Sequence, residues 1–355
     1  MKRYRCSCGA ELFFENDSCV DCGRDIGFDP VNLSVFPLDY LPEVGQVKQR
    51  GADTGIFYRS CENEGREKLG CNWLLRLDDQ NTQCVSCRLT RTIPIQNNEK
   101  NLRRWRILES SKRRLIYNLL NHGLEFENRM QDPVAGLAFD FLEDKRSNPE
   151  MSEEHIYTGH KNGIITINAA EADPEVRVSM RESMNERYRT TLGHFRHEIG
   201  HYYFDKLVMS TDWIKYFIYS FGNPGNDYKE ALDRYYANGP RWDWEHYHIS
   251  AYASMHPLED WAETWAHYLH MCDTMETANS FGMIDVNLRS DDFQSIMSKW
   301  MQLTITMNAL TRSVGKPDAY PFVIKKNVTD KLHLVHRVVL GASNKPVVKE
   351  VEQAF

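Results

Sequence analysis

The sequence predicts a mainly helical α+β protein, in which a small cysteine-rich region precedes a mostly helical domain with a small sheet. Eight of the nine cysteines lie within the first 87 residues. Apolar residues then recur at helical spacing, beginning with Trp105 and Leu108, in several segments. Two short runs, residues 136–142 and 163–168, have the composition of strands and are bounded by turn residues.

The composition is that of an ordinary globular protein. The chain has 355 residues, of which 41% are apolar and 26% charged, enough for a sizeable core in one large domain or two. A net charge of −7 argues against a general binder of nucleic acid or membrane surfaces. No signal peptide precedes Cys6, and no apolar stretch approaches about 18 residues. We therefore expect a cytoplasmic protein.

Two cysteine sets predict structural zinc sites. The first set consists of Cys6, Cys8, Cys19 and Cys22. It forms two close pairs, each followed by glycine, as in a zinc ribbon. The second set, which contains one regular pair and two widely spaced members, consists of Cys61, Cys71, Cys84 and Cys87. Four thiolates close the coordination shell of an ion, so these sites would be structural. Exchange of pairs between the two sites remains open.

Residues 1–92 form this ribbon region. They are rich in Gly, Asn and Asp and should bury little apolar surface, so zinc would supply part of the folding energy. The alternative is a set of buried, reduced cysteines. Cys272 lies far from the others in sequence, and we expect it to be a buried thiol.

Residues 93–122 should contain a bridging helix that ends at Asn121-His122-Gly123. Its other faces carry the basic residues Lys100, Arg103, Arg104, Arg106, Lys112, Arg113 and Arg114. Beside a zinc ribbon, such a face could indicate nucleic-acid binding. A solvated basic face is the commoner arrangement, and we favour it.

Two segments before the central motif are expected to form a strand and a helix. The strand around Gly163, Ile164, Ile165 and Thr166 could offer a free edge to an extended peptide substrate. An internal strand fits the pattern equally well. Asp173-Pro174-Glu175 then resembles a cap, a first-turn proline and a first-turn acid, which begin a helix towards Tyr188.

The central motif is His197-Glu198-Ile199-Gly200-His201. Histidines four residues apart lie on one face of a helix and can bind one metal ion together. The carboxylate of Glu198 can take a proton from metal-bound water, which is the chemistry of zinc hydrolases. Gly200 costs helix stability, which close packing would explain. Asp205, one turn after His201, could orient a ligand imidazole.

The third ligand should come from a later helix that begins at His256-Pro257. Glu259 and Glu263 are one turn apart, so one can bind the metal while the other braces a ligand histidine. Asp260 and His267 are rivals for the ligand role. Any one of these acids could also simply be part of an acidic helix start.

Residues 252–263, Tyr-Ala-Ser-Met-His-Pro-Leu-Glu-Asp-Trp-Ala-Glu, resemble the second motif of glutamate-ligand zinc peptidases of the lethal-factor type. This resemblance implies that Glu259 is the third ligand and that Tyr252 assists the oxyanion. Residues 188–203 are similar to a bacterial family in which a zinc ribbon is joined to a zinc-binding metallopeptidase domain. That resemblance extends to residues 318–322 and implies a zincin-like domain over residues 123–345, followed by a tail at 346–355.

The implied activity is zinc-dependent peptide hydrolysis, with Glu198 as the base and a peptide or protein as substrate. The alternative is a zinc-ribbon adaptor that binds a partner protein and whose helical domain is catalytically idle. We expect further helices near residues 228–236, from Asp291 to about Val314, and near 331–340. His246 and His248, in an aromatic insert, are minor candidates for substrate contact.

Overall fold

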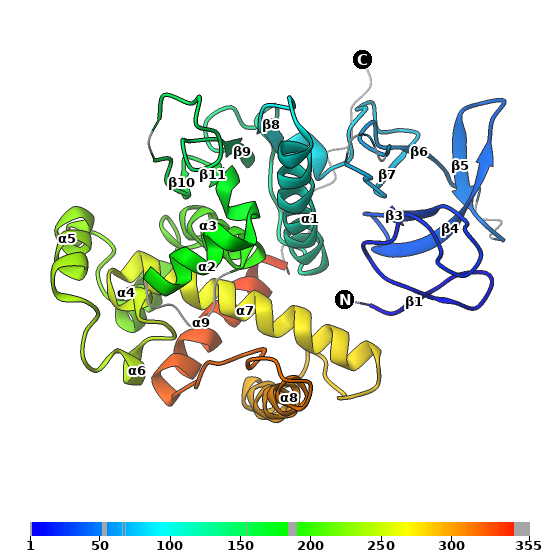
Figure 1. Ribbon diagram of the computed structural model, residues 1–355. Coiled ribbons are helices and arrows are strands. Elements are labelled where there is room, and N and C mark those ends of the chain that lie inside the picture. The colour runs from blue at the N-terminus through cyan, green and yellow to red at the C-terminus, as the bar shows by residue number, and fades with distance from the viewer. Residues whose placement is uncertain are drawn as a thin grey trace, which may run out of the picture.

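The computed structural model describes residues 2–51, 55–65, 67, 69–153, 155–183 and 190–343. Its strand-rich N-terminal part lies on one side of the long helix α1, and most of the helices lie on the other (Figure 1). The predicted fold class, a strand-rich cysteine region followed by a helical domain with a small sheet, is confirmed. The expected tail, residues 346–355, and Tyr188 lie outside the described residues.

The ribbon region contains two antiparallel sheets. Its strands are β1 (Tyr4–Arg5), β2 (Glu11–Leu12), β3 (Ile26–Asp29), β4 (Ser34–Leu41), β5 (Gln46–Gln49), β6 (Phe57–Ser60) and β7 (Leu74–Arg76). β1 pairs with β2, and the other five form a meander in chain order. A short helix η1 (Cys87–Leu89) follows and leads out of this region.

The ribbon region buries more apolar surface than its composition predicts. Phe28 and Trp73 are fully buried, and their rings lie 4.6 Å apart. The ring of Tyr117, on α1 (Glu99–Asn121), lies 5.1 Å from that of Phe14 and 6.0 Å from that of Phe28. The expectation of little buried apolar surface is therefore wrong, because the ribbon region shares its core with α1.

A four-stranded sheet precedes the central motif. Its strands are β8 (Thr90–Thr92), β9 (Ala138–Leu142), β10 (Gly159–Lys161) and β11 (Ile164–Asn168). The order is β10-β11-β9-β8, so β11 pairs with β10 on one side and with β9 on the other. The prediction of a free edge at residues 163–166 is wrong. Gly163 has a φ of 80° and turns the chain back from β10, which takes the edge position in its place.

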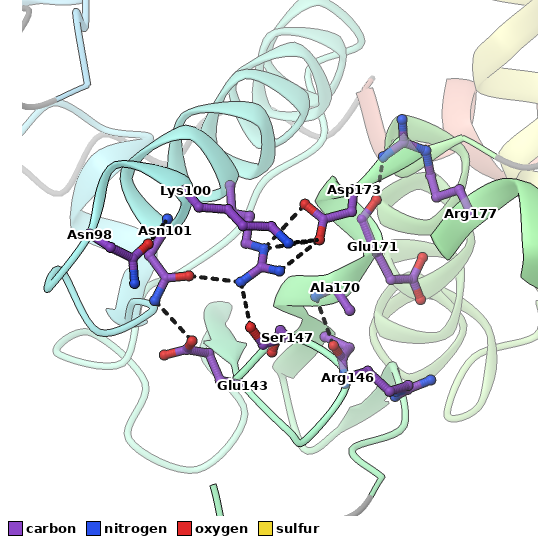
Figure 2. Close-up of polar contacts among 12 residues, drawn as sticks. Asn98, Lys100, Asn101, Glu143, Arg146, Ser147, Ala170, Glu171, Asp173 and Arg177 are labelled. Carbon is purple, nitrogen blue, oxygen red and sulfur yellow. Dashed lines mark hydrogen bonds and ion pairs between the residues drawn. The ribbon is translucent and has the colours of Figure 1, made fainter. Parts of the chain in front are cut away.

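We expected the basic face of α1 to be solvated, but two of its basic side chains are buried. Arg104 is 2% exposed and Lys112 is fully buried. Arg104 donates to Asp173, Asn101 and the Ser147 carbonyl. Figure 2 labels these three partners, of which Asn101 comes from α1 and the other two from segments beside it. Lys112 pairs with Glu109 at 2.9 Å. The contacts of Arg104 join α1 to the segments beside the sheet, and Lys112 also donates to Thr90 of β8, so part of the basic face is structural.

The remaining helices belong to the helical domain that carries the central motif. They are α2 (Pro174–Ser183), α3 (Thr191–Tyr203), α4 (Trp213–Phe221), α5 (Tyr228–Asn238), α6 (Trp244–Tyr247), α7 (Pro257–Ser280), α8 (Phe293–Ser313) and α9 (Lys326–Ser343), with short turns η2 (Ala169–Ala172), η3 (Phe204–Val208, π-helical) and η4 (Tyr252–Ser254). The cap of α8 is Asp292, one residue after the helix start expected at Asp291, because Asp292 accepts from the Gln294 and Ser295 amides. Among the described residues, no helix is long and apolar enough to cross a bilayer.

Candidate functional site

The central motif lies on α3, which packs directly against α7. Thr190 caps α3 by accepting the Gly193 amide at 2.9 Å. A Cβ atom on Gly200 would lie 3.0 Å from the Ala262 Cα and 3.1 Å from the Trp265 Cβ. The Trp261 indole also donates to the Gly200 carbonyl at 2.9 Å. The close packing that we expected to explain Gly200 is therefore present, and it brings the two helices together at the motif.

Three side chains from these helices converge. The ligand atoms of His197, His201 and Glu259 lie within 4.8 Å of one another. His197 Nε2 is 2.9 Å from Glu259 Oε2, and His201 Nε2 is 3.4 Å from Glu259 Oε1. Tetrahedral zinc with bonds of about 2.0–2.1 Å separates its ligand atoms by roughly 3.3 Å. Two imidazoles and a carboxylate at these separations fit a zinc ion.

Burial and charge define the electrostatics of this group. Burial alone would lower the pKa of His197, but hydrogen bonds to Glu259 and Glu263 outweigh it and hold that pKa well above the usual value. Burial would likewise raise the pKa of Glu259, yet His201 and His197 hold it well below its usual range. The carboxylate is therefore ionised and ready to bind a cation.

Glu263 braces His197 from the side opposite Glu259. Its Oε1 lies 2.7 Å from His197 Nδ1, and its Oε2 accepts from the Ser250 hydroxyl at 2.6 Å. Contacts with His197 lower the pKa of Glu263 to about 2 against the effect of burial. A carboxylate on Nδ1 fixes the tautomer of the imidazole and leaves Nε2 for a metal. The expected division of roles between Glu259 and Glu263 matches this geometry.

The two rival ligands point elsewhere. Asp260 accepts from Lys331 Nζ at 2.5 Å and lies 3.1 Å from His248 Nδ1. His267 Nδ1 lies 2.8 Å from the Tyr320 hydroxyl. These contacts place Asp260 and His267 in buried structural pairs on α7, away from the His197 imidazole.

Among the residues that the structure describes, two further predicted site residues make no hydrogen bond to the proposed metal ligands. Asp205 is exposed, and in the described part of the chain it makes no hydrogen bond to His201. The geometry thus does not give it the orienting role we expected. His246 is exposed on the short helix α6, where its backbone carbonyl accepts from Asn327 at 3.1 Å.

Two tyrosines flank the ligand group. The ring of Tyr252 lies 6.1 Å from that of His197, and the resemblance had singled out this residue. Tyr228, at the start of α5, donates its hydroxyl to Glu259 Oε1 at 3.0 Å. Sequence reasoning missed this contact of Tyr228. No spacing rule connects an aromatic residue in the insert to a carboxylate 31 positions later.

The strand β10 of the four-stranded sheet contacts α3, the helix that carries the central motif. His160 accepts the Gly163 amide at 3.0 Å on Nε2, and its ring lies 6.1 Å from that of Tyr202 on α3. Burial, followed by the positive charge of His201, lowers the pKa of His160 to about 4. The edge strand of this sheet therefore runs beside the helix that carries the two ligand histidines.

Each predicted cysteine set forms one group. The four sulfurs of each set lie within 4.8 Å of one another, and no exchange of pairs occurs. Distances include 3.6 Å for Cys6 to Cys22 and 3.8 Å for Cys71 to Cys84. The Cys87 amide donates to the Cys84 sulfur, as zinc knuckles require. Cys272 is buried on α7, apart from both groups, as expected.

The fold and these groups define a class of zinc-binding protein, with a cysteine ribbon followed by a helical domain that holds two histidines and a glutamate together. The chain belongs to the family described as "Putative zinc-binding metallo-peptidase", which matches residues 101–338. Residues 3–98 match a zinc-ribbon domain family. Both families agree with the resemblance seen in the sequence.

Mycobacterial relatives cover nearly the whole chain. "Uncharacterized protein Rv2568c" of Mycobacterium tuberculosis and "Uncharacterized protein Mb2598c" of Mycobacterium bovis are each 39% identical over 348 residues. The match spans 96% of this chain and 95% of each relative, so both parts of the architecture occur together. No solved structure matches the chain significantly.

Proposed function

We propose that this protein is a zinc-dependent peptidase whose catalytic ion is held by His197, His201 and Glu259. The proposal is carried by Glu198, which lies between the two histidines in sequence and is 7% exposed. Burial raises its pKa, although His197 and His201 oppose that shift. In the described part of the chain, no group donates a hydrogen bond to its carboxylate. A carboxylate in this state is suited to proton transfer.

Each residue then has a role in amide hydrolysis. Zinc bound at this site would supply the Lewis acidity that polarises an amide carbonyl and makes water more acidic. Glu198 takes a proton from the attacking water on its carboxylate and gives it to the leaving amine. Tyr252 donates its phenolic hydrogen to the developing oxyanion. Glu263 keeps the imidazole of His197 in the tautomer that leaves Nε2 free.

The two cysteine groups would hold separate structural zinc ions, which gives three ions per chain. Four thiolates leave no open coordination position in either group, whereas two histidines and one glutamate leave one. We propose a peptide or protein as the substrate.

The test is digestion of a peptide library by the full-length, zinc-loaded protein, read by mass spectrometry. Glu198→Gln is the matched variant, because it removes the base and keeps all three ligands. Loss of a general base costs about 10²–10⁴-fold in rate, so cleavage by the variant should fall by that factor while its zinc content stays at the wild-type level. Cleavage by Glu198→Gln at the wild-type rate would refute this mechanism.

The number of zinc ions bound per chain, read together with peptide cleavage, distinguishes the proposed peptidase from the alternative, a catalytically idle zinc-ribbon adaptor. His197→Ala should hold one ion fewer than the wild type, with both cysteine groups still loaded. A wild-type protein that holds all its zinc yet cleaves no peptide would instead favour the idle adaptor.

A further inference from the structure

One side chain from the segment between α3 and α7 contacts a proposed metal ligand. It runs from Gly222 to Gly239, which have φ values of 106° and 74°, and it contains α5. Most of α5 is exposed, and Ala231 is its one buried residue. Tyr228, at its first position, is 40% exposed, yet its hydroxyl reaches the buried carboxylate of Glu259.

The contact divides the two oxygens of Glu259 between different partners. Oε1 accepts from the Tyr228 hydroxyl at 3.0 Å and lies 3.4 Å from His201 Nε2, whereas Oε2 faces His197 Nε2 at 2.9 Å. Glu259 is 3% exposed, so water has little access to satisfy either oxygen. His197 and His201 are themselves proposed ligands, whereas the Tyr228 hydroxyl is not, so Tyr228 can hold Oε1 while the imidazoles bind the ion.

His256 holds Tyr228 in this position. The two rings meet edge to face with centroids 5.2 Å apart. His256 Nε2 is 3.1 Å from the Asn226 carbonyl oxygen, and its Nδ1 accepts the Leu258 amide at 3.1 Å. The side chain that caps α7 therefore also ties down the start of α5. Tyr228 and Glu259 are thus fixed relative to each other from both sides.

We propose that Tyr228 is a positioning residue of the metal centre, where its phenol holds the carboxylate of Glu259 in the orientation that binds the ion. This inference rests on the metal ligands of the proposed function. Groups that hydrogen-bond to metal ligands typically contribute about 10–100-fold to metal affinity or activity. Tyr228 acts on the ligand, whereas Tyr252 is proposed to act on the reacting carbonyl.

The test compares Tyr228→Phe with Tyr219→Phe in the full-length protein. Both variants remove one phenolic oxygen, and Tyr219 is 92% exposed on α4. The probe is zinc itself, titrated in buffers of graded free zinc, and His197→Ala identifies which ion belongs to this site. We expect Tyr228→Phe to bind that ion about 10–100-fold more weakly, with Tyr219→Phe unchanged. Weaker zinc binding lowers the melting temperature of a zinc-loaded protein through linkage, so the fold is checked in the His197→Ala background, where adding Tyr228→Phe should leave the melting curve unchanged.

A second readout follows the ligand geometry. Cobalt replaces zinc in such sites, and its visible d–d spectrum depends on how its ligands are arranged. The difference spectrum between each protein and its His197→Ala counterpart isolates this ion. A changed difference spectrum in Tyr228→Phe alone supports the proposal, because a merely structural role would leave it unaltered.

The outcomes separate this inference from the proposed function. Unchanged zinc affinity and an unchanged cobalt difference spectrum in Tyr228→Phe would overturn the inference. A weakened ion in that variant, in a protein that cleaves no peptide, would support the inference and refute the peptidase. If His197→Ala loses no ion, both are refuted.

Discussion

Gly200→Ala tests whether the close contact between α3 and α7 holds the metal centre together. Alanine is favoured over glycine in a helix by about 1 kcal/mol. Its Cβ would lie 3.0 Å from the Ala262 Cα and 3.1 Å from the Trp265 Cβ, and neither atom can rotate away. Overpacking of this kind costs about 1–3 kcal/mol, so we expect the variant to lose up to about 2 kcal/mol of stability.

The matched control is Gly341→Ala in α9. There the new Cβ would lie 3.5 Å from the nearest atom, Trp213 Cζ2, which is an ordinary contact. The control should therefore gain up to about 1 kcal/mol in chemical denaturation. Gly200→Ala should also bind the ion at His197 more weakly, because the helices must move apart. Equal stabilisation by both variants, with unchanged zinc affinity, would refute this account of Gly200.

Three other predictions concern the bracing carboxylate, a buried histidine and a buried lysine. Glu263→Ala should weaken zinc binding by about 10–100-fold in a chelator titration, because His197 Nδ1 loses its partner. Burial lowers the pKa of His336 to about 4, below its unfolded value of 6.5, so its contribution to stability is complete above pH 6.5 and is lost as the pH falls towards 4. Across that window, His336→Gln should make the slope of unfolding free energy shallower by about 1.4 kcal/mol per pH unit. Lys112→Met should cost about 3–5 kcal/mol in denaturation, because it leaves Glu109 buried and unpaired.

Each of these predictions has an outcome that would contradict it. Lys215→Met breaks an exposed pair with Asp212, so a loss as large as that of Lys112→Met would contradict the role of burial. An unchanged pH slope in His336→Gln would show that this histidine titrates normally. For Glu263→Ala, wild-type zinc affinity would show that the imidazole of His197 needs no brace.

The features predictable from the sequence were those set by local geometry. The spacing of His197 and His201 places both on one helical face whatever surrounds them. Glu259 and Glu263 are likewise one turn apart, so the helix allows one to be a ligand and the other a brace, and the resemblance implied that Glu259 is the ligand. The first cysteine set could be grouped from its spacing and from the glycines that follow its two close pairs, whereas the spacing of the second set left an exchange of pairs open, and the structure shows that each set forms its own group.

The features that could not be predicted depend on contacts between distant parts of the chain. Tyr228 reaches Glu259 across 31 positions, and Arg104 reaches Asp173 across 69. Nothing in the local pattern of a basic helix distinguishes an arginine that is solvated from one that is buried against an acid. The edge strand β10 was not predicted, because residues 159–161 are too few and too polar to be recognised as a strand in the sequence.

A chain of charges joins the ribbon region to the helix that carries the histidines. Glu15 pairs with Arg114 on α1, Arg114 pairs with Asp273 on α7, and Asp273 pairs with Arg196, the neighbour of His197, at distances of 3.0, 3.0 and 2.6 Å. Burial would raise the pKa of Asp273, but Arg196 and Arg114 hold it below its usual value. A fragment that begins after α1 would leave Asp273 with one of these two arginines and would remove the packing of α1 against α3. Experiments on the metal centre therefore require the full chain, since loss of zinc from a fragment would report the missing helix and not the ligands.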